Sequence, residues 1–220
     1  MNGLVQTRSG LIGSAQDIEK LADARKATLL VLSDMHCDDY YLFCEIMKQF
    51  GADSDALIYC GDGIRDIARY FSEATTDESI RKNLPPVVAL ARGNGDYSEY
   101  SAGSLQFDAP DYIMFKAASR TIVATHGHLF GVDFGTDHLA SVASASKASL
   151  VFYGHTHRPY KKIQDNMLVL NPGSVTRPRN ASHPSFAVVT YPGMSEKFEV
   201  NFFAIKQNAF GRYQFSLISI

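Results

Sequence analysis

The sequence is poor in cysteine and in long apolar runs. Its three cysteines, Cys37, Cys44 and Cys60, form no Cys-x-x-Cys pair, and an odd number does not fit a secreted disulfide framework. The apolar run around Leu29–Leu32 is only strand-sized, and residues 1–13 hold no continuous hydrophobic stretch. Neither an export signal nor a membrane span is therefore expected, and we predict a cytoplasmic protein.

The sequence also lacks an excess of either charge. Its 21 basic and 23 acidic residues give a formal net charge of −2, and the basic residues are spread along the chain. Without a basic face, nucleic acid is not an expected partner. What the chain does have is an ordinary globular composition, 45% hydrophobic and 20% charged over 220 residues. This composition is typical of one domain with a substantial core.

The chain is predicted to begin with a short extension. Over residues 1–26, Ser14 and Asp17 resemble a helix cap, and apolar residues follow them at helical spacing. We therefore predict an N-terminal extension with one short helix over residues 1–26 and a single domain over residues 27–220.

The first half of that domain alternates between strand-like and helix-like segments. Aliphatic runs that end at a polar loop are predicted as strands, and these are Thr28–Ser33, Ala56–Cys60 and Val87–Ala91. Helices are predicted over Tyr40–Phe50 and Ile64–Phe71. The pattern indicates a βαβαβ unit, in which ligands gather at the carboxyl ends of parallel strands.

The second half is richer in strands and has one predicted helix, over Thr136–Ser146. The predicted strands are Tyr112–Phe115, Thr121–Thr125, Leu150–Tyr153, Met167–Leu170, Phe186–Tyr191 and Lys197–Ala204. Turns at Asp165-Asn166 and Pro192-Gly193 favour antiparallel hairpins. The whole pattern predicts an α/β fold of two packed mixed β-sheets flanked by helices, in four layers α/β/β/α.

Seven side chains that can bind metal follow these strands in five short glycine-flanked clusters. They are Asp34, His36, Asp62, Asn94, His126, His155 and His157. One residue separates Asp34 from His36, so both can point toward one cation. Asp62 offers two carboxylate oxygens and is the candidate to bridge two ions about 4 Å apart. Because the last three histidines come from the second half, the ions would join the two sheets.

The charge of such a centre favours an anionic substrate. Two divalent cations outweigh the charges of Asp34, Asp62 and one hydroxide, and the remaining positive charge suits a phosphate ester and its transition state. Four imidazoles suit transition metals better than magnesium or calcium, which prefer oxygen ligands. We expect two divalent ions, manganese first, with iron, nickel, cobalt or zinc as alternatives.

The order of the clusters resembles the calcineurin-like metallophosphoesterase superfamily, whose pattern is D-x-H, G-D, G-N-[HC]-[DE], H and G-H-x-H. Four segments look closer still to its small bacterial YfcE-type phosphodiesterase branch, and they are Arg92–Asp96, Thr125–Gly131, Tyr153–His157 and Asn171–Val175. The similarity spans about Thr28 to Tyr191, which is most of the chain.

The resemblance implies a two-metal hydrolase of phosphodiesters, most simply of small molecules. One ion would be held by Asp34, His36, Asp62 and His157, and the other by Asp62, Asn94, His126 and His155. The family's mechanism implies attack by a hydroxide that bridges the ions, with no covalent enzyme intermediate. Asp62, Asn94 and His128 are the predicted catalytic residues.

One position departs from the family pattern. Gly95 stands where larger members carry a histidine, the general acid, and where the small branch usually carries cysteine. Leaving groups of low pKa should therefore be cleaved best, because general acid catalysis contributes about 10²- to 10⁴-fold. His128 is the candidate substitute, although a hydrogen bond that orients a metal ligand is an equal alternative role for it.

Several nearby polar residues have structural interpretations. Asp96 is expected to anchor the Asn94 loop, and Asp38 and Asp39 to cap the following helix. Arg177 and Arg179 either steer phosphate or lie on a solvated loop.

Other functions remain open from the sequence. Within catalysis, the alternatives are a phosphomonoesterase and a nucleotide pyrophosphatase. The same fold also occurs as a trafficking-complex subunit without metal ligands, so a protein-interaction scaffold is the alternative from another class. A nuclease is disfavoured by the absence of a basic face, and a homo-oligomer is compatible with the sequence.

Overall fold

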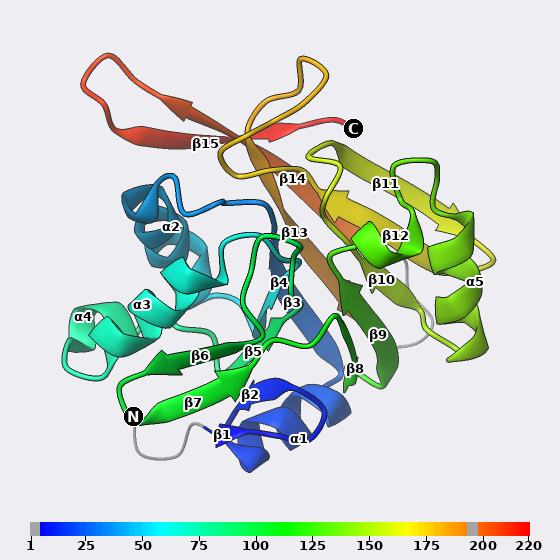
Figure 1. The fold of residues 1–220 in the computed structure, drawn as a ribbon, viewed down its shortest axis with the longest axis horizontal. Coiled ribbons are helices and arrows are strands. Elements are labelled where there is room, and N and C mark those ends of the chain that lie inside the picture. The colour runs from blue at the N-terminus through cyan, green and yellow to red at the C-terminus, as the bar shows by residue number, and fades with distance from the viewer. Residues whose placement is uncertain (1–4, 193–197) are drawn as a thin grey trace.

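Two β-sheets form the centre of the protein, as Figure 1 shows for the computed structural model, which describes residues 5–192 and 198–220. The larger sheet has the order β1-β2-β5-β4-β3-β13-β14-β15. Its strands are β1 (Val5–Gln6), β2 (Leu11–Gly13), β3 (Lys26–Leu32), β4 (Ala56–Tyr59), β5 (Val87–Leu90), β13 (Ser185–Pro192), β14 (Glu199–Gln207) and β15 (Tyr213–Ile218). Strands β3, β4 and β5 are parallel, as the predicted βαβαβ unit requires.

The smaller sheet has the order β11-β12-β10-β9-β8. Its strands are β8 (Tyr112–Ala117), β9 (Arg120–Thr125), β10 (Leu150–Phe152), β11 (Pro159–Gln164) and β12 (Met167–Pro172). A separate hairpin pairs β6 (Glu99–Ala102) with β7 (Leu105–Asp108). The helices are α1 (Ala15–Asp23), α2 (Tyr40–Ile46), the π-helical η1 (Met47–Gly51), α3 (Ile64–Ala74), α4 (Glu78–Arg81), the 3₁₀ turn η2 (His128–Phe130) and α5 (Asp137–Ala145).

Strand β3 shows why the larger sheet is covered on both faces. Alternate side chains of a strand point to opposite faces. Leu29 and Val31 join the cluster of apolar residues between the two sheets. Leu30 and Leu32 join the cluster formed with the helices, which includes Phe43 of α2. A strand buried on both faces needs the continuous aliphatic run that the sequence has there.

The smaller sheet is covered in the same way. Phe152 of β10 packs between the sheets, whereas Val151 packs with Leu139 and Ala143 of α5. The layers are therefore helix, sheet, sheet and helix, with α2 and α3 on one side and α5 on the other (Figure 1). This confirms the predicted fold class of two packed sheets flanked by helices.

The N-terminal residues extend the larger sheet. Ser14 caps α1 by accepting a hydrogen bond from the Asp17 N–H at 3.0 Å, as predicted. Strand β2, which the sequence did not predict, pairs antiparallel with β5. Leu21 of α1 packs among the residues between the sheets. The division of the chain at residue 26 stays a prediction.

The prediction for the second half was partly wrong. The expected hairpin at Asp165-Asn166 is present, and both residues have positive φ (50° and 63°). However, β10 pairs in parallel with β9 and with β12. Helix α5 connects β9 to β10 and brings the chain back to the edge of the sheet at which β9 begins. Such a crossover makes parallel pairing of the two strands possible.

Some short elements were not predicted at all. Strands β1, β6, β7, β11 and β15 carry too few buried residues to give a clear pattern. The predicted helix at Tyr40–Phe50 changes to π-helical geometry from Met47. The predicted turn at Pro192-Gly193 and the predicted strand start at Lys197 involve residues outside the described ranges. Within those ranges, no helix is long and apolar enough to cross a membrane.

Candidate metal centre

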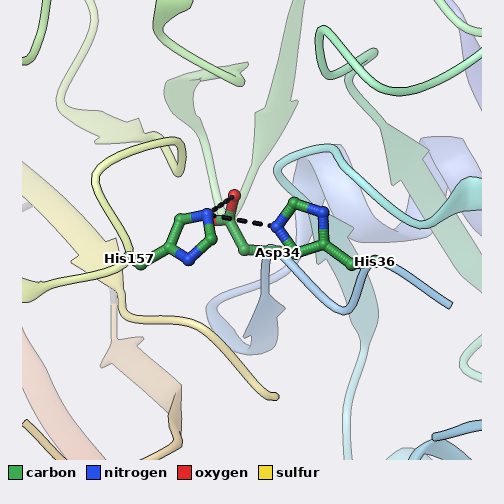
Figure 2. Close-up of side chains that lie close together, drawn as sticks. All are labelled: Asp34, His36 and His157. Carbon is green, nitrogen blue, oxygen red and sulfur yellow. Dashed lines mark hydrogen bonds and ion pairs between the residues drawn. The ribbon is translucent and has the colours of Figure 1, made fainter. Parts of the chain in front are cut away.

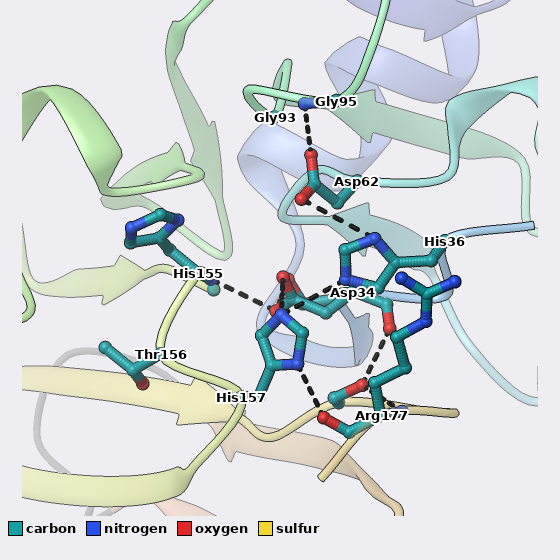
Figure 3. A network of polar contacts seen from close by, with 12 residues as sticks. Asp34, His36, Asp62, Gly93, Gly95, His155, Thr156, His157 and Arg177 are labelled. Atoms are coloured by element: carbon teal, nitrogen blue, oxygen red, sulfur yellow. Dashed lines mark hydrogen bonds and ion pairs between the residues drawn. The ribbon is translucent and has the colours of Figure 1, made fainter. Parts of the chain in front are cut away.

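The seven predicted ligands lie in loops that follow five different strands. Loops after β3, β4 and β5 of the larger sheet carry Asp34, His36, Asp62 and Asn94, and loops after β9 and β10 of the smaller sheet carry His126, His155 and His157. Figure 3 shows side chains from both sheets pointing toward one centre. The site is therefore built at the carboxyl ends of parallel strands, where open α/β sheets usually place ligands.

The backbone of these loops is unusual. Asp34, His36, Asp62, His155 and His157 all have positive φ, between 52° and 67°. A non-glycine residue in this region costs about 1 to 3 kcal/mol, and such residues concentrate at functional sites. Five of the seven predicted ligands therefore have an unfavourable backbone conformation, as is common for residues of functional sites.

The first group of ligand atoms comprises Asp34, His36 and His157 (Figure 2). The Nε2 atoms of the two histidines lie 3.1 Å apart. The Nε2 atom of His157 also lies 3.3 Å from Oδ1 of Asp34. Three donor atoms from two sheets thus converge within the spacing that one metal ion can bind.

The second group comprises Asp34, Asp62 and His126. Nε2 of His126 lies 3.6 Å from Oδ2 of Asp62, 3.2 Å from Oδ1 of Asn94 and 3.2 Å from Nδ1 of His155. Asn94 and His155, the two remaining predicted ligands, therefore surround the same imidazole nitrogen. All seven predicted residues are brought together.

The two aspartates connect the groups. Oδ2 of Asp62 lies 3.8 Å from Nδ1 of His36 and 3.6 Å from Nε2 of His126. Asp34 is fully buried, and its Oδ1 is approached by Nε2 of His157 at 3.3 Å and by Nε2 of His126 at 4.0 Å. Burying a carboxylate is unfavourable unless it is paired, and a cation bound between these groups would compensate for the burial of Asp34. The donor set therefore fits a bound metal pair.

Three histidines are oriented by a hydrogen bond from the ring nitrogen that faces away from the centre. Nδ1 of His126 lies 2.7 Å from the Cys60 carbonyl oxygen, and Nδ1 of His157 lies 2.5 Å from the Arg177 carbonyl oxygen. When each Nδ1–H donates to its carbonyl, the Nε2 lone pair is left free to bind a metal.

The third of these histidines uses a carboxylate instead. Nε2 of His155 lies 2.9 Å from Oδ2 of Asp133, which leaves Nδ1 of His155 facing His126. Sequence reasoning did not single out Asp133, because it lies in the irregular segment after η2 and in none of the five clusters. Only the folded loop reveals this contact.

Asp96 anchors the loops that carry the ligands. Its Oδ2 accepts hydrogen bonds from the N–H groups of Asp62 (2.7 Å) and Gly93 (3.0 Å). Its Oδ1 accepts from Gly63 and Ile64, both at 2.9 Å, at the N-terminus of α3. This carboxylate binds the Asp62 loop and the Asn94 loop together, a wider role than the predicted anchoring of the Asn94 loop.

The Asn-Pro-Gly-Ser turn supports the loops from the other side. Nδ2 of Asn171 donates to the Gly154 carbonyl at 2.7 Å, and Oγ of Ser174 donates to the Asp34 carbonyl at 2.7 Å. Gly154 is required here because a Cβ atom at this position would lie 1.9 Å from Oγ of Ser33. The histidine loop can therefore approach β3 only through a glycine.

Burial and neighbouring charges shift the pKa values of His36, His128 and His157. Burial lowers the pKa of His36, although Asp62 and Asp34 oppose the shift. It also acts to lower the pKa of His157, but the hydrogen bond and charge of Asp34 outweigh it and raise that pKa. The His128 pKa is lowered by burial and by His126 and His155. The rings of His128 and His126 lie 5.4 Å apart, so His128 borders the centre.

The remaining predictions had mixed outcomes. Asp39 caps α2 through the Leu42 N–H at 2.9 Å, as predicted. Asp38 does not cap this helix. It instead binds the Arg177 guanidinium at 2.5 and 2.6 Å, because the loop after β12 lies beside it. Arg177 is therefore held by a carboxylate, whereas a role of Arg179 in steering phosphate stays a prediction.

Comparison with known proteins gives the same family as the motifs. The profile of the calcineurin-like phosphoesterase superfamily domain matches residues 28–193. A probable metallophosphoesterase of Bacillus subtilis, YsnB, is 32% identical over 162 residues, which cover 74% of this chain and 83% of YsnB. The phosphodiesterase YfcE of Escherichia coli is 29% identical over 152 residues, covering 66% and 76% of the two chains.

Solved structures share the fold. A predicted phosphoesterase of Streptococcus pneumoniae aligns with a TM-score of 0.62 and 26% identity, over 88% of this chain and 98% of that one. Vacuolar Protein Sorting 29 of Cryptosporidium parvum aligns with a TM-score of 0.61 over 88% and 97% of the chains, but its 16% identity shows the fold alone. With the profile covering most of its length and the donor set assembled, the chain belongs to the calcineurin-like phosphoesterase superfamily.

Proposed function

We propose that this protein hydrolyses phosphodiesters of small molecules with two divalent transition-metal ions. The observation that carries the proposal is the convergence of seven candidate ligand side chains from two sheets in two linked groups. Oδ1 of buried Asp34 lies 3.3 Å from Nε2 of His157 in one group and 4.0 Å from Nε2 of His126 in the other. The phosphodiesterase name of YfcE supports the choice of diesters. Manganese is the first choice of metal, since imidazole and carboxylate together suit such an ion.

Different residues of the protein would hold each metal ion and position the ester. Asp34, His36, Asp62 and His157 would hold one ion, and Asp62, Asn94, His126 and His155 the other. When bound, the ions supply Lewis acidity and make a water molecule nucleophilic near neutral pH. Asp62 sets the spacing of the two groups because its Oδ2 faces His36 and His126. Asn94, exposed at the edge of the site, would help to position the ester.

His128 completes the proposed catalytic set. Its ring borders those of His126 and His155, with centroids 5.4 and 6.1 Å away. Burial and the neighbouring His126 and His155 lower its pKa, which favours the uncharged ring. An uncharged imidazole can donate one N–H hydrogen bond to an ester oxygen.

Paired aryl phosphates test this function. Protein purified without added metal should gain activity on addition of Mn²⁺, and bis(4-nitrophenyl) phosphate should give a higher kcat/KM than 4-nitrophenyl phosphate. A preference for the monoester would favour the phosphomonoesterase alternative. Failure to bind metal and to turn over either ester would favour the scaffold alternative, whose support is the shared fold with Vacuolar Protein Sorting 29.

Replacing Gly95 with histidine is expected to increase activity selectively on esters with poor leaving groups. A Cβ atom at Gly95 would have Oδ1 of Asp62, at 3.1 Å, as its nearest neighbour, so a side chain there requires that oxygen to shift by a few tenths of an ångström. The imidazole would supply the missing proton donor, and the ratio of kcat/KM for methyl to 4-nitrophenyl leaving groups should rise by about 10²-fold. Gly95→Ala is the control, because it adds a side chain without a proton. An equal change in both variants would contradict this account.

A further inference from the structure

A cavity of about 180 Å³ opens beside the candidate metal centre. His36 and Asp62, two of the candidate metal ligands, belong to its lining, so the cavity adjoins the place where a phosphate ester would be bound. Tyr97, Tyr100 and Arg65 also belong to the lining. None of the five sequence clusters accounts for these three residues.

Tyr100 forms a fixed wall of the cavity. Its ring stacks on Phe107 with centroids 5.6 Å apart and an interplanar angle of 17°. Its hydroxyl accepts a hydrogen bond from the Tyr97 N–H at 2.9 Å and donates to Oδ1 of Asp96 at 3.3 Å. These contacts tie the wall to the same carboxylate that anchors the Asp62 loop.

Tyr97 is different because its side chain is mostly in solvent. It is 75% exposed, and its ring lies 6.3 Å from that of Tyr100. An aromatic ring left this exposed next to a substrate site still has a face on which another ring can pack. Arg65 adds a cation at the rim, where it also interacts with the Cys37 thiol.

The cavity also has a suitable size. A cavity of about 150 Å³ is enough to bind benzene, so about 180 Å³ can hold one six-membered ring. Gly95 contributes to the lining, and because it has no side chain it takes up little of the space in the cavity. The residue that departs from the family pattern is therefore part of this cavity.

We propose that the cavity binds a single-ring aromatic group of the phosphate ester, with Tyr97 as the residue that selects it. This inference rests on the proposed phosphodiesterase function and specifies its substrate class. Tyr97 would contribute by aromatic packing, Tyr100 by holding the wall, and Arg65 by attraction to the face of the bound ring.

Binding of two phosphonates tests the proposal without turnover. Calorimetry on the Mn²⁺-loaded protein should show tighter binding of phenylphosphonate than of methylphosphonate. In Tyr97→Ala this preference should fall by about 2- to 10-fold, because one aromatic pair is lost. Tyr97→Phe keeps the ring and should keep the preference. Tyr41→Ala is the matched control, since Tyr41 is 76% exposed and lies on α2 outside the cavity lining.

Kinetics separate this inference from the proposed function. If the unmodified protein hydrolyses bis(4-nitrophenyl) phosphate and Tyr97→Ala raises its KM with little change in kcat, the proposal holds. If turnover is present but Tyr97→Ala leaves the phenylphosphonate preference and KM unchanged, the aromatic cavity is wrong and the function stands. If Mn²⁺ produces no turnover at all, the proposed function is wrong. The phosphonate assay then tests the cavity separately: loss of the phenyl preference in Tyr97→Ala supports the aromatic cavity, and an unchanged preference contradicts it.

Discussion

Replacing Asp62 with asparagine is expected to lower kcat/KM for bis(4-nitrophenyl) phosphate about a thousandfold, because metal ions contribute several kcal/mol to such reactions. Oδ1 of Asp62 accepts a hydrogen bond from the Gly95 N–H at 2.7 Å. The amide oxygen of an asparagine would take that place, and its NH₂ group would then face His36 and His126. An NH₂ group has no lone pair for a cation, so the link between the two groups of ligands is lost.

The readouts for Asp62→Asn are metal content and steady-state kinetics at saturating Mn²⁺. Asp53→Asn is the control, because Asp53 is an exposed carboxylate on the loop after η1, outside the site. Both variants should fold, since each replaces a carboxylate with an amide of the same shape. Retention of wild-type activity and of two bound ions in Asp62→Asn would overturn the proposed role of Asp62.

Adding Mn²⁺ to the metal-depleted protein is expected to raise its Tm by about 8 to 16 °C. A ligand that binds only the native state at about 1,000 times its Kd stabilises that state by about 4 kcal/mol. For a chain of this size, each kcal/mol shifts Tm by about 2 to 4 °C. The physical source is the site itself, because ions bound there would satisfy Asp34 and hold the loops of the two sheets together.

Thermal unfolding followed by circular dichroism, with and without a chelator, measures this shift. Asp34→Asn should lose most of the shift, because its buried Oδ1 faces both groups of ligands. Asp53→Asn should keep it. If Asp34→Asn were stabilised as much as the unmodified protein, the ions would have to bind elsewhere.

The parallel strands β3, β4 and β5 were predictable because burial on both faces demands continuous aliphatic runs, and the sequence contains three of them. The short strands β6, β7 and β15 were not predictable. Their residues are largely exposed and alternate weakly, so pairing with a neighbouring strand decides their conformation. The parallel pairing of β9 with β10 was missed for a related reason, since it depends on the path of α5.

The types and order of the seven candidate ligands were determined by the sequence alone, since glycine-flanked Asp, Asn and His residues directly after aliphatic strands have little use in a core. The tertiary structure decided what no local pattern contains. It placed Asp133 against His155, turned Asp38 toward Arg177, and formed a cavity whose lining includes Gly95 and Tyr97. Most of these contacts join loops that follow different strands. Their distances depend on how the folded backbone packs these loops together, and no local sequence pattern contains that information.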